Sequence, residues 1–180
     1  NRIMHRDLLL NKITNILGST NESYEAKLVS MCDDAKRIFI TGAGRSKLVG
    51  NFLGMRLMHS GYTVYVQGEI STPSIREGDL LIVISGSGET TQLVSFTNKA
   101  KSEGAKVVLI CSKSSSTIGD LADQTIQVGN DDSFAPTKGM PMGTMFELST
   151  LIFLEAIVSH LIHEKGIPEE EMKHRHANME

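Results

Sequence analysis

The sequence of 180 residues predicts a doubly wound α/β fold, in which helices cover both faces of a five-stranded parallel sheet. Five short segments rich in Ile and Val alternate with segments of helical character, an order typical of buried parallel sheets. Glycine-rich turns follow the first and third of these apolar segments, as is common where a strand leads into a helix. Right-handed crossovers then favour the flavodoxin-like strand order.

Two helices are expected before the first strand. Apolar residues recur at helical spacing over residues 3–17, and a second helix is expected from about residue 21 to 35. Because both precede the first strand, we interpret residues 1–35 as a helical arm added to an α/β core. The core would comprise residues 36–165 and the C-terminal tail residues 166–180, all within a single domain.

The five predicted strands are short and apolar, and the third is the most hydrophobic. Helices that follow the first and third strands are expected to end near Ser60 and Glu103. The strands are predicted at residues 37–41, 62–67, 79–85, 106–111 and 124–129.

After the fifth strand, a loop over residues 130–143 leads into a long apolar helix over residues 144–165. The apolar stripe of this helix is wider than one buried face requires. We therefore expect part of it to pack against another subunit. The tail is expected to form a short polar helix with an irregular end.

Composition and charge argue against several kinds of partner. The net charge is −3, aromatic residues make up 5% of the chain and Trp is absent, which disfavours nucleic acid. Cys32 and Cys111 form neither a disulfide framework nor a metal-ligand pair, and they indicate a reducing compartment. No segment comes near the roughly 20 apolar residues of a membrane span, and residues 1–17 lack the apolar core of a signal peptide. A cytoplasmic protein without a membrane partner is expected.

The two glycine-rich turns, residues 42–46 and 85–90, are the strongest functional signal. Each links a strand to a helix N-terminus, where backbone N–H groups and the helix dipole favour phosphate. Four hydroxyls are expected to surround one anion: those of Ser46, Ser85, Ser87 and Thr90. The full set of predicted phosphate or substrate contacts is Gly44, Arg45, Ser46, Glu69, Ser85, Gly86, Ser87 and Thr90.

A dinucleotide site is the rival interpretation of these turns. The G-x-G-x-x-G pattern needs glycine at position 47, where Lys47 stands, but Glu69 follows the second strand roughly where a ribose-binding acid would lie. The P-loop pattern is absent. The turns are also compatible with ordinary tight connections that bind nothing.

The segments "GAGRS", "GEISTP", "SGSGET", "PMGTMFE" and "RHAN" together resemble the 6-phospho-3-hexuloisomerases of the sugar-isomerase (SIS) family, over nearly the whole chain. The resemblance implies interconversion of D-arabino-3-hexulose 6-phosphate and D-fructose 6-phosphate through a cis-enediol. It also implies a role in the ribulose monophosphate route of formaldehyde fixation, with 3-hexulose-6-phosphate synthase as functional partner. No metal or organic cofactor and a homotetramer are implied as well. A phosphosugar-binding SIS regulator without catalysis, or an isomerase for another phosphosugar such as arabinose 5-phosphate, are the alternatives.

Such an isomerisation needs a base that carries a proton between two carbons. Glu147 is the leading candidate, because the first turn of the long helix faces the strand ends, although Thr144 and Glu147 also fit a capping box. His176 is the second candidate, because it matches the family's tail motif, and the tail is expected to reach a neighbouring subunit's site. His59 lies about 20 Å from the site by helical rise, and Lys138 is a weaker candidate for closing over an anion.

Overall fold

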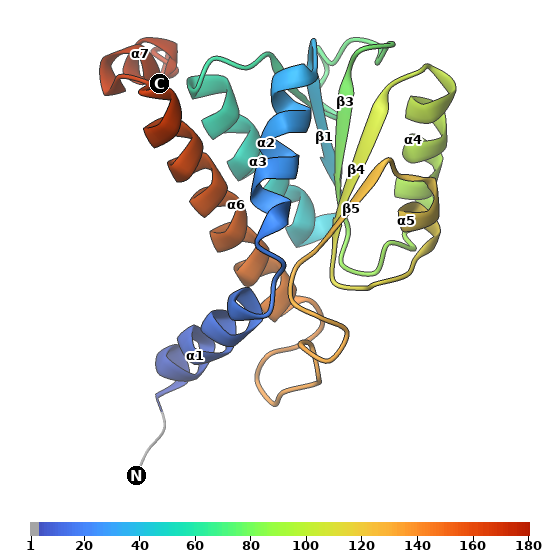
Figure 1. Cartoon of the computed structure of the whole chain (residues 1–180), viewed down its shortest axis with the longest axis vertical. Coiled ribbons are helices and arrows are strands. Elements are labelled where there is room, and N and C mark those ends of the chain that lie inside the picture. The colour runs from blue at the N-terminus through green and yellow to red at the C-terminus, as the bar shows by residue number, and fades with distance from the viewer. Residues whose placement is uncertain (1–3) are drawn as a thin grey trace.

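The computed structural model describes residues 4–180 and has the predicted doubly wound architecture (Figure 1). All five strands are parallel and lie in the order β2-β1-β3-β4-β5, which is the predicted flavodoxin-like order. The strands are β1 (Ile38–Gly42), β2 (Val64–Val66), β3 (Leu80–Ile84), β4 (Lys106–Cys111) and β5 (Gln124–Gln127).

Seven helices are assigned within residues 4–180, and six of them were predicted. They are α1 (His5–Gly18), α2 (Ser23–Asp34), α3 (Gly44–His59), α4 (Thr91–Ser102), α5 (Thr117–Leu121), α6 (Thr144–Lys165) and α7 (Glu169–Arg175). The prediction missed α5, whose five residues are too few to show helical periodicity. The first residue of the predicted helix over 3–17, Ile3, lies outside the described residues.

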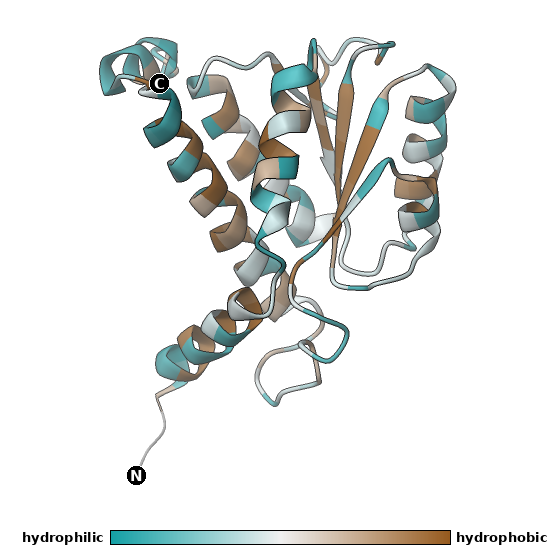
Figure 2. Ribbon diagram, in the orientation of Figure 1, coloured by the Kyte–Doolittle hydropathy of each residue, from teal (hydrophilic) through white to brown (hydrophobic). Residues whose placement is uncertain are grey.

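The two faces of the sheet carry separate hydrophobic clusters, because side chains alternate along each strand. Ile82 on one face and Val83 on the other are both completely buried. The first face packs against α1, α2, α3 and α6, and the second against α4 and α5. Figure 2 shows the central strands largely in brown, as hydrophobic segments, whereas β5 at the sheet's edge is partly hydrophilic.

The two N-terminal helices differ in how far they enter this core. In α2, Leu28 and Cys32 are buried in the cluster beneath the first face of the sheet. By contrast, α1 extends away from the sheet (Figure 1) and buries only Ile13 and Ile16. α2 therefore contributes to the core packing, and α1 is the part of residues 1–35 that projects as an arm.

The 22-residue helix α6 is long and apolar enough to cross a membrane by length and composition alone. The expectation that no segment approaches such a length was therefore wrong. Half of its most apolar stretch is buried inside the structure, as in the core helices of soluble proteins that meet the same criterion. It packs against α1, α2 and α3, and these three helices account for much of its wide apolar stripe.

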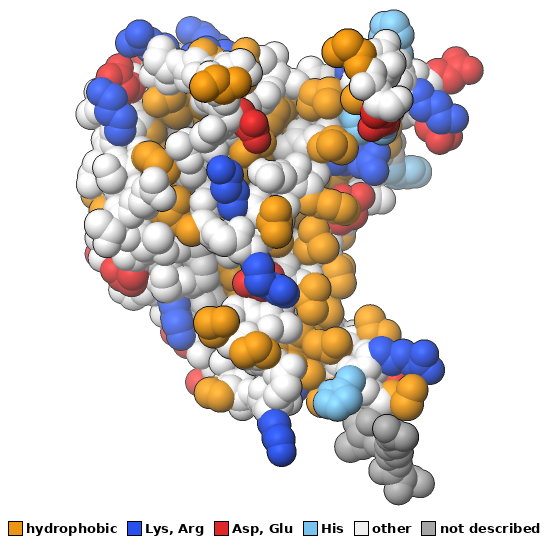
Figure 3. Space-filling view, turned by 180° about the vertical axis from the view of Figure 1, so that it is seen from behind, with side chains coloured by type: hydrophobic (Ala, Val, Ile, Leu, Met, Phe, Trp, Pro, Cys, Tyr) orange, Lys and Arg blue, Asp and Glu red, His pale blue; other side chains and the backbone are white. Residues whose placement is uncertain are grey.

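A row of exposed large apolar side chains lies on α3, whereas the sequence analysis expected such a surface on α6. Leu48, Phe52 and Met55 are spaced along one side of α3 and are 64%, 50% and 59% exposed. On α6, Ile152 is the exposed large apolar residue, at 41%. Figure 3 views the molecule from behind and shows hydrophobic side chains gathered on this side.

Candidate active site

The two glycine-rich turns meet at the carboxyl edge of the sheet. β1 and β3 are neighbours, with Gly42 opposite Ile84, so the turns that follow them lie side by side. From this point α3 packs on one face of the sheet and α4 on the other. This is the topological switch point, where ligands bind in doubly wound folds.

The first turn is tightly packed at its start and open at its end. A side chain at Gly42 would come within 3.0 Å of the Lys47 backbone and 3.1 Å of the Ile84 carbonyl oxygen. Gly44 begins α3 with a φ of 56°, in the left-handed region that favours glycine. Arg45 then points outward with 64% of its side chain exposed, and Ser46 is half-buried.

The two serines of the second turn, Ser85 and Ser87, have different roles. Ser85 is buried, and its Oγ accepts a hydrogen bond of 3.0 Å from the Gly88 N–H. The exposed Ser87 accepts a bond of 3.2 Å from the Glu89 N–H. Ser85 therefore shapes the turn from inside, while the Ser87 hydroxyl is accessible to a ligand.

Several donors of this turn are available to an anion. Among residues 4–180, neither the backbone N–H groups nor the hydroxyls of Ser87 and Thr90 donate a hydrogen bond. Thr90 is also the N-cap of α4, next to the positive end of the helix dipole. Unpaired donors at a helix N-terminus are the arrangement that binds phosphate.

Glu147 lies beside the first turn, and its carboxylate forms an ion pair with Arg45. Its side chain is only 14% exposed. The capping-box interpretation is wrong, because Gly143 is the N-cap of α6 and no side chain caps it. Thr144 instead donates to the Pro141 carbonyl at 2.7 Å. The Glu147 carboxylate is therefore held by a cation rather than by the backbone.

The same end of α6 also contacts the second turn. A side chain at Gly86 would meet the ring of Phe146 at 3.1 Å. Since Phe146 precedes Glu147, the first turn of α6 packs against both glycine-rich turns. The structure thus brings the carboxylate, the guanidinium and the free donors to one edge of the sheet.

His176 lies far from this site within the same chain, at the C-terminal end of α3. Its ring stacks on His59 with 5.1 Å between ring centroids, and Arg175 donates to the His59 carbonyl at 3.0 Å. Burial, helped by Arg56 and His176, lowers the pKa of His59. Arg45 lies at the start of α3 and His59 at its end, so helical rise puts about 20 Å between the residues that contact Glu147 and His176 within one chain.

The sequence analysis did not assign Lys47 or Thr41 to the site, although both lie near it. The Lys47 amine lies over the turn after β2, 2.9 Å from where a side-chain carbon at Gly68 would be. Buried Thr41 donates to the Gln67 side chain at 3.2 Å. Lys47 had been noted only as a missing glycine. Glu69 is exposed in the adjacent turn and forms no ion pair with any residue that the structure describes.

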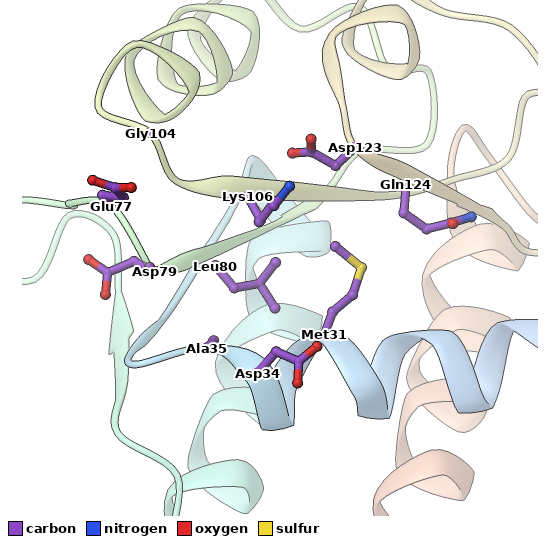
Figure 4. A pocket seen from close by; sticks show the side chains of 11 residues that line it. Met31, Asp34, Ala35, Glu77, Asp79, Leu80, Gly104, Lys106, Asp123 and Gln124 are labelled. Carbon is purple, nitrogen blue, oxygen red and sulfur yellow. The ribbon is translucent and has the colours of Figure 1, made fainter.

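Other features near the sheet do not coincide with this site. Lys138 is exposed in the loop before α6. A cavity of about 490 Å³ opens at the amino ends of β3, β4 and β5, the opposite edge (Figure 4). Its polar lining includes Asp34, Glu77 and Asp123, and Lys106 also lies there. Within residues 4–180, no cluster of His, Cys, Asp and Glu is suited to a metal ion.

Comparison with known proteins places this arrangement in a family. Residues 31–152 match the SIS domain. A 3-hexulose-6-phosphate isomerase of Methylomonas aminofaciens is 51% identical over 178 residues, covering 98% of each chain. A Bacillus subtilis protein of the same name is 38% identical over 96% of this chain and 95% of that relative.

A solved structure extends the likeness to three dimensions. It is a hypothetical protein of Methanococcus jannaschii, for which a function of 3-hexulose-6-phosphate isomerase was inferred. Its TM-score is 0.88 at 34% identity, covering 99% of this chain and 100% of that one. The chain therefore belongs to the SIS-domain family, in the branch that contains the 3-hexulose-6-phosphate isomerases.

Proposed function

We propose that the protein is an isomerase that interconverts D-arabino-3-hexulose 6-phosphate and D-fructose 6-phosphate. The observation that carries the proposal is the 51% identity, over nearly the full length of both chains, to an isomerase named for this substrate. The site is consistent with it, because unpaired donors for a phosphate and a carboxylate for proton transfer lie at one edge of the sheet.

In the proposed reaction, the N–H groups and hydroxyls of Ser87 and Thr90 bind the phosphate. Glu147 removes the proton from C2 of the 3-keto sugar, which gives the 2,3-enediol, and returns a proton to C3. The hydroxyl proton moves from the C2 oxygen to the C3 oxygen in the same conversion. Arg45 orients the Glu147 carboxylate and contacts the substrate.

Proton exchange tests this function directly. Fructose 6-phosphate incubated with the protein in D₂O should exchange its C3 proton and form the 3-keto isomer, both followed by NMR. Binding of fructose 6-phosphate without exchange would indicate a non-catalytic phosphosugar sensor. Exchange with arabinose 5-phosphate alone would indicate an aldose–ketose isomerase.

The proposed assembly is a homo-oligomer, a tetramer as the family resemblance implies, in which the exposed face of α3 packs against a second copy. Leu48, Phe52 and Met55 support this, because a solvent-exposed apolar row is typical of an interface. The row begins one turn from Arg45, so the partner would also cover the site. His176 would serve the site of a neighbouring subunit, since it lies at the far edge of its own chain.

Subunit complementation separates this arrangement from a site within one chain. Glu147→Gln and His176→Ala should each be inactive alone. Mixed subunits, formed by denaturing and refolding the two variants together, should regain activity, because some sites then combine an intact Glu147 with an intact His176. No recovery would place both residues in the same chain's site. Full activity of His176→Ala would remove it from the mechanism.

The cellular setting follows the family resemblance. We propose a cytoplasmic enzyme of the ribulose monophosphate route that needs no metal and uses the product of 3-hexulose-6-phosphate synthase. Two free, buried cysteines support a reducing compartment. Burial raises the pKa of Cys32 to about 12, so its thiol stays protonated and unreactive. Activity should survive dialysis against a chelator.

A further inference from the structure

Most of the hydrogen bonds that tie the phosphate-binding turn, residues 85–90, to the strand-end loops go to one neighbouring segment, and the Ser85 N–H also donates to the Ile110 carbonyl of β4 at 3.0 Å. This segment, residues 112–118, runs from the end of β4 into α5. Ser112 donates to the Gly86 carbonyl through its N–H at 3.0 Å and through its Oγ at 2.7 Å. The Ile118 N–H donates to the Gly88 carbonyl at 3.0 Å. Two carbonyls of the turn are therefore bound by donors of the same segment.

A side chain of the turn is bound in the same way. The Glu89 carboxylate accepts a bond of 2.9 Å from the Thr117 N–H and one of 2.6 Å from the Thr117 hydroxyl. These hydrogen bonds lower the pKa of Glu89, so its carboxyl is charged at neutral pH. Charge-assisted bonds of this kind are stronger than bonds between neutral groups.

The backbone of the turn at Gly88 packs directly against Ser116, so the turn has no room to shift toward α5. Gly88 has a φ of 68°, and a side-chain carbon there would lie 2.2 Å from the Ser116 Oγ. Ser116 cannot easily move aside, because it is buried and its Oγ accepts the Gly119 N–H at 2.9 Å. The N-terminal turn of α5 thus forms a wall against which the phosphate-binding turn rests.

This attachment has a consequence for the ligand. Residues 112–118 bind three acceptors of the turn: the carbonyls of Gly86 and Gly88 and the carboxylate of Glu89. The donors of Ser87 and Thr90 stay unpaired among the described residues. A carboxylate released from Thr117 would lie two residues from Ser87 and would repel a bound phosphate. The pairing therefore separates the negative groups of the turn from its anion-binding donors.

We propose that residues 112–118 are a positioning element for the phosphate-binding turn, with the Glu89–Thr117 contact as its side-chain lock. The inference deepens the proposed function and depends on it. Neither Glu89 nor Thr117 is required to touch the substrate. Their effect should therefore appear in substrate affinity rather than in the chemical step.

The experiment compares Thr117→Val and Glu89→Ala with the wild type. Thr117→Val should raise the KM for fructose 6-phosphate and the inhibition constant of inorganic phosphate about tenfold, the worth of one charge-assisted hydrogen bond. Glu89→Ala should raise both constants by less, because it removes the hydrogen bonds together with the carboxylate that would repel the phosphate. The kcat should stay within about twofold, because the base is untouched. Thr117→Ser keeps the hydroxyl and should restore the wild-type KM. Glu77→Ala removes an exposed carboxylate at the opposite edge and should change nothing.

The outcomes separate the lock from the function it serves. If the wild type does not isomerise fructose 6-phosphate, the proposed function fails. If the wild type is active and both variants keep its KM, or lose kcat alone, the lock is wrong. Thermal unfolding checks that the variants fold. Should Glu89→Ala not fold, Thr117→Val and Thr117→Ser still decide the question, because the first replaces the hydroxyl of Thr117 by a methyl group and the second keeps the hydroxyl.

Discussion

Polar residues lie at both the amino and the carboxyl edge of the sheet, but the two edges differ in whether their hydrogen-bond donors have partners. At the amino edge the charges pair with one another: Arg37 with Asp79 at 2.5 Å, and Lys101 with Asp123 at 2.7 Å. At the carboxyl edge, Ser87 and Thr90 keep donors with no partner among residues 4–180. The carboxyl edge also holds the ion pair between Arg45 and Glu147. What distinguishes it is the set of unpaired donors at the N-terminus of α4, which indicates a binding site. Substitutions at the two edges should therefore affect different measurements.

The largest expected effect is on catalysis at the carboxyl edge. Glu147→Gln removes the proposed base and should lower kcat by about 10²–10⁴, the range of general base catalysis, in both directions. The loss of C3 proton exchange in D₂O measures it. Glu155→Gln on the same helix, whose carboxylate lies 4.0 Å from Arg56, is the matched control and should remain active. Full activity of Glu147→Gln would shift the search for the base to Glu69.

A second substitution at this edge tests affinity. Ser87→Leu places a bulky apolar side chain beside the free N–H groups and should raise KM about tenfold or more. Steady-state kinetics with fructose 6-phosphate measures it. Ser102→Leu, at the exposed far end of α4, should leave KM unchanged. A normal KM for Ser87→Leu would contradict the assignment of this turn to the phosphate.

At the amino edge the expected effect is on stability. Asp79 is buried, bonds Arg37 and accepts the Arg76 N–H at 2.8 Å. Asp79→Asn should cost about 2–4 kcal/mol of unfolding free energy while kcat stays unchanged. Urea denaturation measures it. Asp123→Asn, in a more exposed pair, should cost about 1 kcal/mol or less. A kcat loss in Asp79→Asn would mean that the two edges are coupled.

The smallest expected effect is on how the stability of the fold depends on pH. Because the pKa of His59 is lowered in the folded chain, the unfolded chain binds a proton first as pH falls. Stability is therefore lost as pH decreases below about 6.5. The Tm of His59→Gln should fall less than that of the wild type between pH 7.5 and pH 5.5. His160→Gln, at an exposed position, should follow the wild type.

The sequence predicted where the strands lie because buried apolar segments and the turns between them are local signals, and the right-handed crossover rule then gave their order in the sheet. The helix over 144–165 was predicted to the residue, since its apolar run is long. The helix α5 has no such run. Its start depends on the Ser116 cap and on Glu89, which lies 28 positions from its partner Thr117. Its existence was therefore hidden from an analysis of periodicity.

The meeting of the two glycine-rich turns was predictable, but the contacts around them were not. The position of the two turns follows from topology, since carboxyl ends of parallel strands meet at one edge. The partner of Glu147 does not, because Arg45 is 102 positions away. Neither the burial of Ser85 nor the stacking of His176 on His59 has a local signal. Such features depend on how separate elements pack.

Side-chain contacts link α3 to the segment formed by α6 and the tail at two places, one at each end of α3. Arg45 contacts Glu147 at their beginnings, and His59 stacks on His176, which the chain reaches after α6. One residue inserted into a helix turns everything beyond it by about 100° and advances it by about 1.5 Å. An insertion in either helix alone would thus put one of the two contacts out of phase. The lengths of α3 and α6 are consequently a matched pair, and in evolution a change in one would require compensation in the other or in the tail.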